Sequence, residues 1–145
     1  MLILVRGLPG SGKSSLAREF NTYVCSADDY FMEDGDYKFD ASKLADAHAD
    51  CLKRTRDILT DVRDLGDCVV ANTFSQRWEM EPYIRLAREL DIRLYIVDLY
   101  DGGLTSEELA ARNSHGVPLS SIENMRARWE HDWKNGNPIP PWERE

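Results

Sequence analysis

The stretch Gly7-Leu8-Pro9-Gly10-Ser11-Gly12-Lys13-Ser14 lies between a short apolar run and an amphipathic segment. Residues 2–6 have the pattern of a buried parallel strand, and residues 14–20 place Leu16, Ala17 and Phe20 at helical spacing. A strand, a glycine turn and a helix in this order form the context that a phosphate-binding P-loop requires. The sequence therefore predicts a P-loop that binds a nucleoside triphosphate.

Each part of this stretch has an expected role in binding. Glycines let main-chain N–H groups approach a phosphate, and the positive end of the following helix favours negative charge. Lys13 is expected to reach the β- and γ-phosphates, and the hydroxyl of Ser14 to bind Mg²⁺. The predicted cofactors are ATP and Mg²⁺, and the predicted binding residues are Gly7, Leu8, Pro9, Gly10, Ser11, Gly12, Lys13, Ser14 and Ser15.

Length and composition indicate one soluble domain. The chain has 145 residues, of which 42% are hydrophobic and 30% are charged, a balance too apolar for disorder. The longest apolar run is too short for a transmembrane helix, so we expect no membrane partner and a cytoplasmic location. Cys25, Cys51 and Cys68 are widely spaced, which favours free thiols over disulfides or zinc. The net charge of −8 argues against a broad nucleic-acid footprint and allows a local basic pocket.

The rest of the chain alternates predicted strands and helices. Short buried strands are expected at residues 23–25, 68–71 and 92–97, and a helical pattern follows each strand. We therefore predict an α/β fold of the P-loop NTPase type, with a parallel sheet of about four strands, helices on both faces and a carboxyl-terminal helical lid. Residues 1–134 would form the P-loop kinase domain, and residues 135–145 an irregular proline-rich tail that Trp142 attaches to the surface.

Capping patterns set the expected helix boundaries. Asp40 or Ser42 would cap a long helix that ends at Leu65, and a second helix covers residues 78–90. Capping boxes at Thr105–Glu108 and Ser120–Glu123 would open two more helices, the last of which ends at Asn135-Gly136. The long helix has a predicted buried stripe, which consists of Leu44, Cys51, Leu52, Thr55, Ile58, Leu59, Val62 and Leu65. His48 is expected on the same face, either as a core histidine or as a contact of the acceptor substrate.

Asp28 and Asp29 follow the second predicted strand, at the edge where open α/β sheets bind ligands. In kinases that phosphorylate a hydroxyl, one carboxylate accepts the proton of the acceptor. We assign this role to Asp28 and place Asp29 near Mg²⁺ or its waters; a solvated acidic turn is the alternative. Asn72-Thr73 stands where a Walker B aspartate would follow the third strand, so the ion would depend on Ser14, phosphates and waters.

Residues 112–118 form a basic, glycine-containing link between the last two predicted helices. This link is expected to close over the nucleotide as a lid. Arg112 would then neutralise charge on the transferred phosphoryl group, and an exposed arginine near a helix end is the alternative. The predicted catalytic residues are thus Lys13, Asp28 and Arg112.

These motifs resemble the kinase domain of the bacteriophage polynucleotide kinase family, which phosphorylates 5′-hydroxyl ends. The resemblance is carried by residues 7–20, Asp28-Asp29-Tyr30, Arg112-Asn113-Ser114 and Val117-Pro118. A second set is similar to the polynucleotide-kinase-like domains of some eukaryotic multidomain proteins, and it comprises residues 35–40, 47–48, 78–80, 82–83 and 112–117. The resemblance implies that Asp28 is the general base, that Arg112 contacts the γ-phosphate and that the first strand is central, between the third and the fourth.

Three positions depart from the phage pattern. Phe31 stands where the family has an arginine that grips the acceptor phosphate, Asn72-Thr73-Phe74 replaces Asp-Thr-Asn, and the second lid arginine falls near Gly116. Three functions therefore remain open: a kinase that acts on a 5′-hydroxyl end of DNA or RNA, a small-molecule kinase of the zeta-toxin or antibiotic phosphotransferase type, and an ATP-binding module with little turnover. The sequence indicates no oligomeric state.

Overall fold

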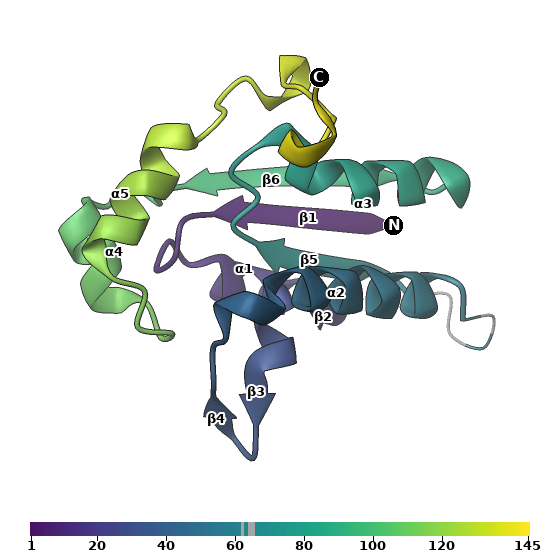
Figure 1. The fold of residues 1–145 in the computed structure, drawn as a ribbon. Helices are drawn as coiled ribbons and strands as arrows, with labels where there is room; N and C mark the ends of the chain where they lie inside the picture. The colour runs from purple at the N-terminus through teal and green to yellow at the C-terminus, as the bar shows by residue number, and fades with distance from the viewer. Residues whose placement is uncertain (62, 64–65) are drawn as a thin grey trace.

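The structure, a computed structural model, describes residues 1–61, 63 and 66–145 around a parallel sheet of four strands (Figure 1). The strands are β1 (Leu2–Gly7), β2 (Tyr23–Cys25), β5 (Cys68–Asn72) and β6 (Leu94–Tyr100), in the order β2-β5-β1-β6. β1 pairs with β5 from Leu2 opposite Cys68 to Arg6 opposite Asn72, and with β6 along its other edge. The predicted fold and the central position of the first strand are confirmed, although the fourth strand lies later than residues 92–97.

The central strands β1 and β5 are apolar along most of their length, and successive residues of a strand point to opposite sides of the sheet. Both faces of the sheet are therefore apolar. Leu2, Leu4 and Val70 share one core with α2 (Leu44–Leu59) and α3 (Arg77–Glu89). Ile3 and Val69 belong to a second core with Ala17 of α1 (Lys13–Glu19). Figure 1 shows the two long helices on one face and α1 on the other.

The remaining elements gather around the carboxyl ends of the strands. The 3-10 helix η1 (Ala27–Phe31) leads into a short hairpin of β3 (Met32–Glu33) and β4 (Asp36–Tyr37), and η2 (Ala41–Lys43) precedes α2. The lid consists of α4 (Ser106–Arg112) and α5 (Leu119–Arg128). Its apolar residues Leu109, Ile122 and Trp129 pack with Leu8 of the P-loop in a third core. The lid is therefore built directly onto the phosphate-binding loop.

The helix that was expected to reach Leu65 ends at Leu59. Thr60 caps it, and the carbonyl of Arg56 accepts both the main-chain N–H of Thr60 at 2.9 Å and the Thr60 hydroxyl at 2.7 Å. Val62 and Leu65 of the predicted stripe lie outside the described residues, while Leu44 is 43% exposed. His48 is exposed as well, so it is not the core histidine that the pattern allowed.

The capping box at Thr105–Glu108 is confirmed, but the one at Ser120–Glu123 is wrong. α5 begins after Pro118 and ends at Arg128, well before Asn135-Gly136. Trp129 leaves the helix with a ψ of 123°, and the next N–H, that of Glu130, donates to the carbonyl of Ser75 at 2.8 Å. A bond to a distant loop thus ends the helix earlier than its apolar spacing indicates.

The carboxyl-terminal segment includes two short 3-10 helices, η3 (Trp133–Asn135) and η4 (Pro141–Glu143). Trp142 meets Trp78 edge to face, with ring centroids 5.3 Å apart, although 74% of Trp142 stays exposed. The predicted free thiols are confirmed, since all three cysteines are buried and unbridged. Within the described part of the chain, every helix is too short or too polar to cross a bilayer.

Candidate active site

The P-loop, residues 7–14, turns at the carboxyl end of β1, and two glycines determine its path. Gly10 and Gly12 have φ angles of +83° and +101°, which residues with a Cβ rarely adopt. A Cβ on Gly10 would also lie 2.5 Å from the carbonyl oxygen of Leu109 in α4. Only glycine therefore fits where the loop meets the lid.

Main-chain hydrogen bonds attach this loop to both neighbouring strands. The N–H of Gly7 donates to the carbonyl of Thr73 at 3.2 Å, and the N–H of Leu8 donates to that of Tyr100 at 2.8 Å. The buried hydroxyl of Ser11 has no hydrogen-bond partner among the described residues, and Ser14 is exposed at the start of α1. An unsatisfied buried hydroxyl in a glycine-rich turn before a helix fits a phosphate group, whose oxygens accept such bonds.

Lys13 is half-buried, and its ammonium donates to the carbonyl of Leu8 at 3.3 Å. Burial lowers the pKa of Lys13 to about 8, while the negative charge of Asp28 acts in the opposite direction. The ammonium is therefore mostly charged at neutral pH and close to its titration range. The two predicted catalytic residues Lys13 and Asp28 lie near enough to influence each other electrostatically.

Asp28 lies at the centre of a cluster that joins three separate segments. The hydroxyl of Tyr37, in β4, donates to one carboxylate oxygen of Asp28 at 3.0 Å. His115, from the lid, places Nε2 3.6 Å from the other oxygen and its ring 4.0 Å from that of Tyr37. Burial, and then the neighbouring carboxylate, raise the pKa of Tyr37, so its hydroxyl remains a donor. The Nδ1 atom of His115 is buried without a partner among the described residues.

Tyr37 and His115 were not assigned to the site from the sequence. Both lie in segments that carry the polynucleotide-kinase resemblance, which was the available signal. Neither segment shows by its own pattern that it reaches Asp28, because the hairpin and the lid are far apart along the chain.

Two asparagines hold this cluster in place. The side-chain oxygen of Asn72, at the end of β5, accepts the N–H of Ala27 at 2.9 Å and so positions the segment that carries Asp28. Asn113 accepts the N–H of Val117 at 2.8 Å and donates to the carbonyl of the same residue at 3.0 Å. These two hydrogen bonds close the turn that contains His115.

Asp29 and Arg112 are placed differently from Asp28. One carboxylate oxygen of Asp29 accepts the N–H of Ser26 at 3.1 Å and faces Arg54 at 3.3 Å, so Asp29 caps η1. Arg112 is exposed at the end of α4, without an ion pair or hydrogen bond to any described residue. Within residues 1–61, 63 and 66–145, no three His, Cys, Asp or Glu side chains form a metal cluster. Ser14, exposed at the start of α1, is the P-loop residue whose hydroxyl could bind Mg²⁺.

A buried arginine beside the P-loop was also missed from the sequence. Arg6 is fully buried, and its guanidinium donates to the carbonyls of Phe74, Ser75 and Glu130 at 2.9 to 3.0 Å. It also pairs with Asp98 at 3.1 Å and lies 4.1 Å from the centre of the Trp129 ring. Burial lowers the pKa of Arg6, and Asp98 counteracts this shift. Arg6 connects β1, the loop after β5, β6 and the end of α5.

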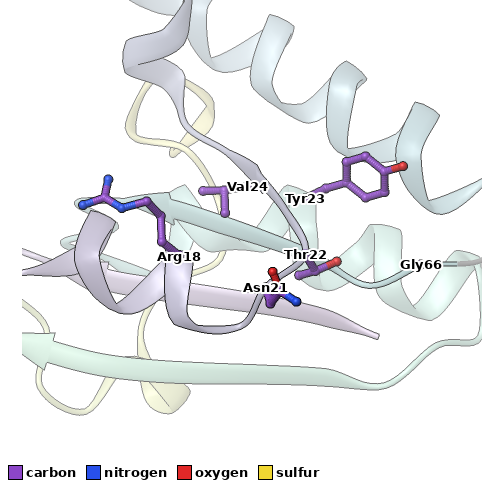
Figure 2. A pocket seen from close by; sticks show the side chains of 6 residues that line it. All are labelled: Arg18, Asn21, Thr22, Tyr23, Val24 and Gly66. Atoms are coloured by element: carbon purple, nitrogen blue, oxygen red, sulfur yellow. The ribbon is translucent and has the colours of Figure 1, made fainter.

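The hollow in Figure 2 lies away from this cluster. It measures about 620 Å³ and sits beside the edge strand β2 and the carboxyl-terminal end of α1, whereas the P-loop precedes α1. Its lining consists of Arg18, Asn21, Thr22, Tyr23, Val24 and Gly66. This hollow therefore contributes nothing to the candidate active site.

Comparison with known proteins identifies one family and several similar proteins and structures. The AAA domain family matches residues 2–131. Human NEDD4-binding protein 2 is 34% identical over 136 residues, which make up 90% of this chain and 8% of that protein. A gluconokinase structure from Sinorhizobium meliloti 1021 has a TM-score of 0.52 at 19% identity, and the match covers 88% of this chain and 74% of that one.

The three comparisons differ in what they establish. The gluconokinase shares the fold, and the chain spans only a small part of NEDD4-binding protein 2, so neither similarity transfers an acceptor to this protein. The family match includes the P-loop, the segment of Asp28 and both lid helices. The chain thus belongs to the AAA domain family, as a member with the P-loop and the parallel sheet of a P-loop kinase.

Proposed function

We propose that this protein is an ATP- and Mg²⁺-dependent phosphotransferase that moves the γ-phosphate to a hydroxyl, with the 5′-hydroxyl end of a polynucleotide as the preferred acceptor. The observation that carries the proposal is the Asp28 carboxylate, held by Tyr37 and faced by His115 beside the P-loop lysine. A carboxylate oriented in this way suits a general base, which accelerates phosphoryl transfer to a hydroxyl by accepting the hydroxyl proton.

Each residue of the cluster has a role in this proposal. Bound ATP would supply the phosphoryl group, and Mg²⁺ would offset part of its charge. The loop N–H groups and the Lys13 ammonium bind the phosphates, and Ser14 offers its hydroxyl to the ion. Asp28 accepts the proton of the acceptor hydroxyl as the new oxygen–phosphorus bond forms and the bond to the leaving ADP oxygen breaks. Arg112 is the lid cation that would approach the transferred group.

His115 belongs to the lid and lies next to Asp28, where the acceptor hydroxyl would bind. It lies 3.6 Å from Asp28 and is presented by the turn that Asn113 brackets. An acceptor hydroxyl that approaches this oxygen of Asp28 has to enter next to the imidazole or displace it. We therefore assign His115 and Tyr37 as positioning residues that orient the base and exclude water from it.

The choice of acceptor rests on two opposing sets of observations. The segments that resemble polynucleotide kinases favour a 5′-hydroxyl end, and they include Tyr37 and His115 at the cluster. Phe31, at the position of the phosphate-gripping arginine, is 5% exposed and belongs to the main core, so it cannot bind an acceptor phosphate. This burial and the net charge of −8 favour a small-molecule kinase as the second candidate.

A transfer screen with radiolabelled γ-phosphate separates these functions. The acceptors are 5′-hydroxyl DNA and RNA, nucleosides, nucleotide sugars and gluconate, and Lys13→Ala is the inactive control. We expect label on the 5′-hydroxyl strands. Label on a sugar or nucleotide sugar alone would favour the small-molecule kinase, and ATP binding without transfer to any acceptor would leave a nucleotide-binding module.

A further inference from the structure

A second hollow lies next to the active-site cluster, between the β3–β4 hairpin and the η2 turn that precedes α2. It measures about 640 Å³, within the ~300–1,000 Å³ typical of small-molecule sites. Its lining consists of three aromatic residues, two lysines, two carboxylates and an alanine, namely Tyr30, Phe31, Phe39, Lys38, Lys43, Glu33, Asp40 and Ala41. In Figure 1 the hairpin that contributes Glu33 to this lining projects from the body of the domain.

The aromatic rings are exposed yet held in place. Phe39 is 54% exposed and Tyr30 40%, although large apolar side chains are usually buried. The Phe39 ring lies 5.1 Å from that of the buried Phe31 and is nearly parallel to that of Tyr37, at 6.4 Å. The hollow thus offers an oriented ring that needs little ordering before a flat ligand stacks on it.

The two lysines differ in availability. Lys38 lies 3.7 Å from the carboxylate of Glu33. The ammonium of Lys43 forms no hydrogen bond or ion pair within the described part of the chain, although the main-chain N–H of Lys43 donates to the carbonyl of Asp40 at 3.0 Å. The carboxylate of Asp40 attracts this ammonium and accepts the N–H and hydroxyl of Ser42. Lys43 is therefore the cation that is free to pair with an anionic group of a ligand.

Two aromatic side chains connect this hollow to the reacting group. Phe39 stacks on Tyr37, and the hydroxyl of Tyr37 donates to Asp28. A ligand stacked on Phe39 is thus connected to the Asp28 carboxylate through two aromatic side chains, Phe39 and Tyr37. This arrangement suits an acceptor that extends beyond its reacting hydroxyl.

We propose that the hollow binds the second nucleotide of a single-stranded acceptor. The base of this nucleotide stacks on the exposed ring of Phe39, and its linking phosphate lies beside Lys43. Aromatic rings and cations in one groove are the usual means of binding single strands without reading their sequence. This inference rests on the proposed transfer to a 5′-hydroxyl. It explains how an acidic chain without the acceptor arginine can still select a polynucleotide.

The test measures kcat/KM for a nucleoside, the matching dinucleotide with a free 5′-hydroxyl, and a longer single strand. One stacked base increases kcat/KM by roughly 5- to 150-fold from nucleoside to dinucleotide, and the longer strand adds little because the hollow has room for one nucleotide. Phe39→Ala reduces the ratio of dinucleotide to nucleoside toward one. Lys43→Gln lowers the slope of log affinity against log salt by about 0.7, the value for one phosphate contact with a single strand.

Lys53→Gln is the matched control, because Lys53 is an exposed lysine of α2 that pairs with Asp57 at 2.8 Å. It leaves both the ratio and the salt slope unchanged, and circular dichroism establishes that every variant is folded. Equal kcat/KM for nucleoside and dinucleotide, or a ratio that is unchanged in Phe39→Ala, refutes the nucleotide-binding role of the hollow. The proposed transfer to a 5′-hydroxyl is then still supported. No transfer to any member of the series refutes both proposals.

Discussion

Replacing Asp28 by asparagine tests the proposed mechanism directly. The amide keeps an oxygen that can accept the hydroxyl of Tyr37, now 3.0 Å from the carboxylate, so the turn and the hairpin are expected to fold. The change removes the negative charge and the ability to take up a proton. Loss of a general base lowers kcat by ~10²–10⁴-fold, which corresponds to about 3–5 kcal/mol of transition-state stabilisation.

The same substitution has a second, electrostatic consequence. Burial lowers the pKa of Lys13 to about 8 against the opposing charge of Asp28, so removal of that charge lowers the pKa further. ATP binding to Asp28→Asn should therefore begin to weaken at a lower pH than binding to the unchanged protein. At pH 7 the affinity should remain close to normal, because the P-loop contacts are intact.

Steady-state kinetics at saturating ATP give kcat, and calorimetry between pH 6.5 and 9 gives the ATP affinity. Asp36→Asn is the control for charge, because Asp36 is an exposed aspartate of β4, the strand that carries Tyr37. This substitution should leave kcat unaltered. Full activity of Asp28→Asn would refute the base assignment and leave positioning by Lys13 as the source of catalysis. A loss of ATP affinity as large as the loss of kcat would instead indicate a structural role.

Four further outcomes are expected. Lys13→Ala should abolish transfer and weaken ATP binding without unfolding the protein, and unchanged ATP affinity by calorimetry would contradict the assignment. ATP affinity should fall as the pH rises above about 8, because the phosphates bind the protonated ammonium more tightly; Lys13→Arg, which stays charged, should remove this dependence. Asp29→Ala should lower the free energy of unfolding by about 0.5–2 kcal/mol as a lost cap, since its carboxylate already binds Ser26 and Arg54, and a weaker Mg²⁺ dependence of activity would favour the metal role instead. Arg6→Met should cost about 3–5 kcal/mol in urea unfolding because it leaves buried carbonyls and a carboxylate unpaired, and a change below 1 kcal/mol would show that the site relaxes.

Local patterns in the sequence predicted the fold class, and the strand order came from a resemblance to known kinases. Residues 7–14 combine glycines, a lysine and a serine at positions that only a strand–turn–helix arrangement uses, and the apolar runs identify the strands of the sheet. Parallel strands with helical crossovers leave few possible arrangements, and the family resemblance selected the observed order. Lys13, Ser14 and Asp28 were predicted as site residues because each follows a predicted strand end.

The helix ends were less predictable, because their causes are not local. α5 ends before Trp129, and the next N–H, that of Glu130, donates to the carbonyl of Ser75, more than fifty residues away. No capping pattern in the sequence predicts this contact. α2 also ends before its predicted boundary, at Leu59, where the N–H and the hydroxyl of Thr60 both donate to the carbonyl of Arg56. In α5 a specific hydrogen bond to a distant segment outweighed the helical periodicity.

The sequence by itself determined the nucleotide side of the site, because a P-loop binds phosphate through consecutive main-chain groups. Only the tertiary structure decided the acceptor side, where residues 28, 37 and 115 meet from a 3-10 helix, a hairpin and the lid. It also decided the role of Arg6, an arginine within an apolar strand whose partners come from three distant segments. Side-chain contacts between segments far apart in the chain follow from packing, which periodicity and spacing do not encode.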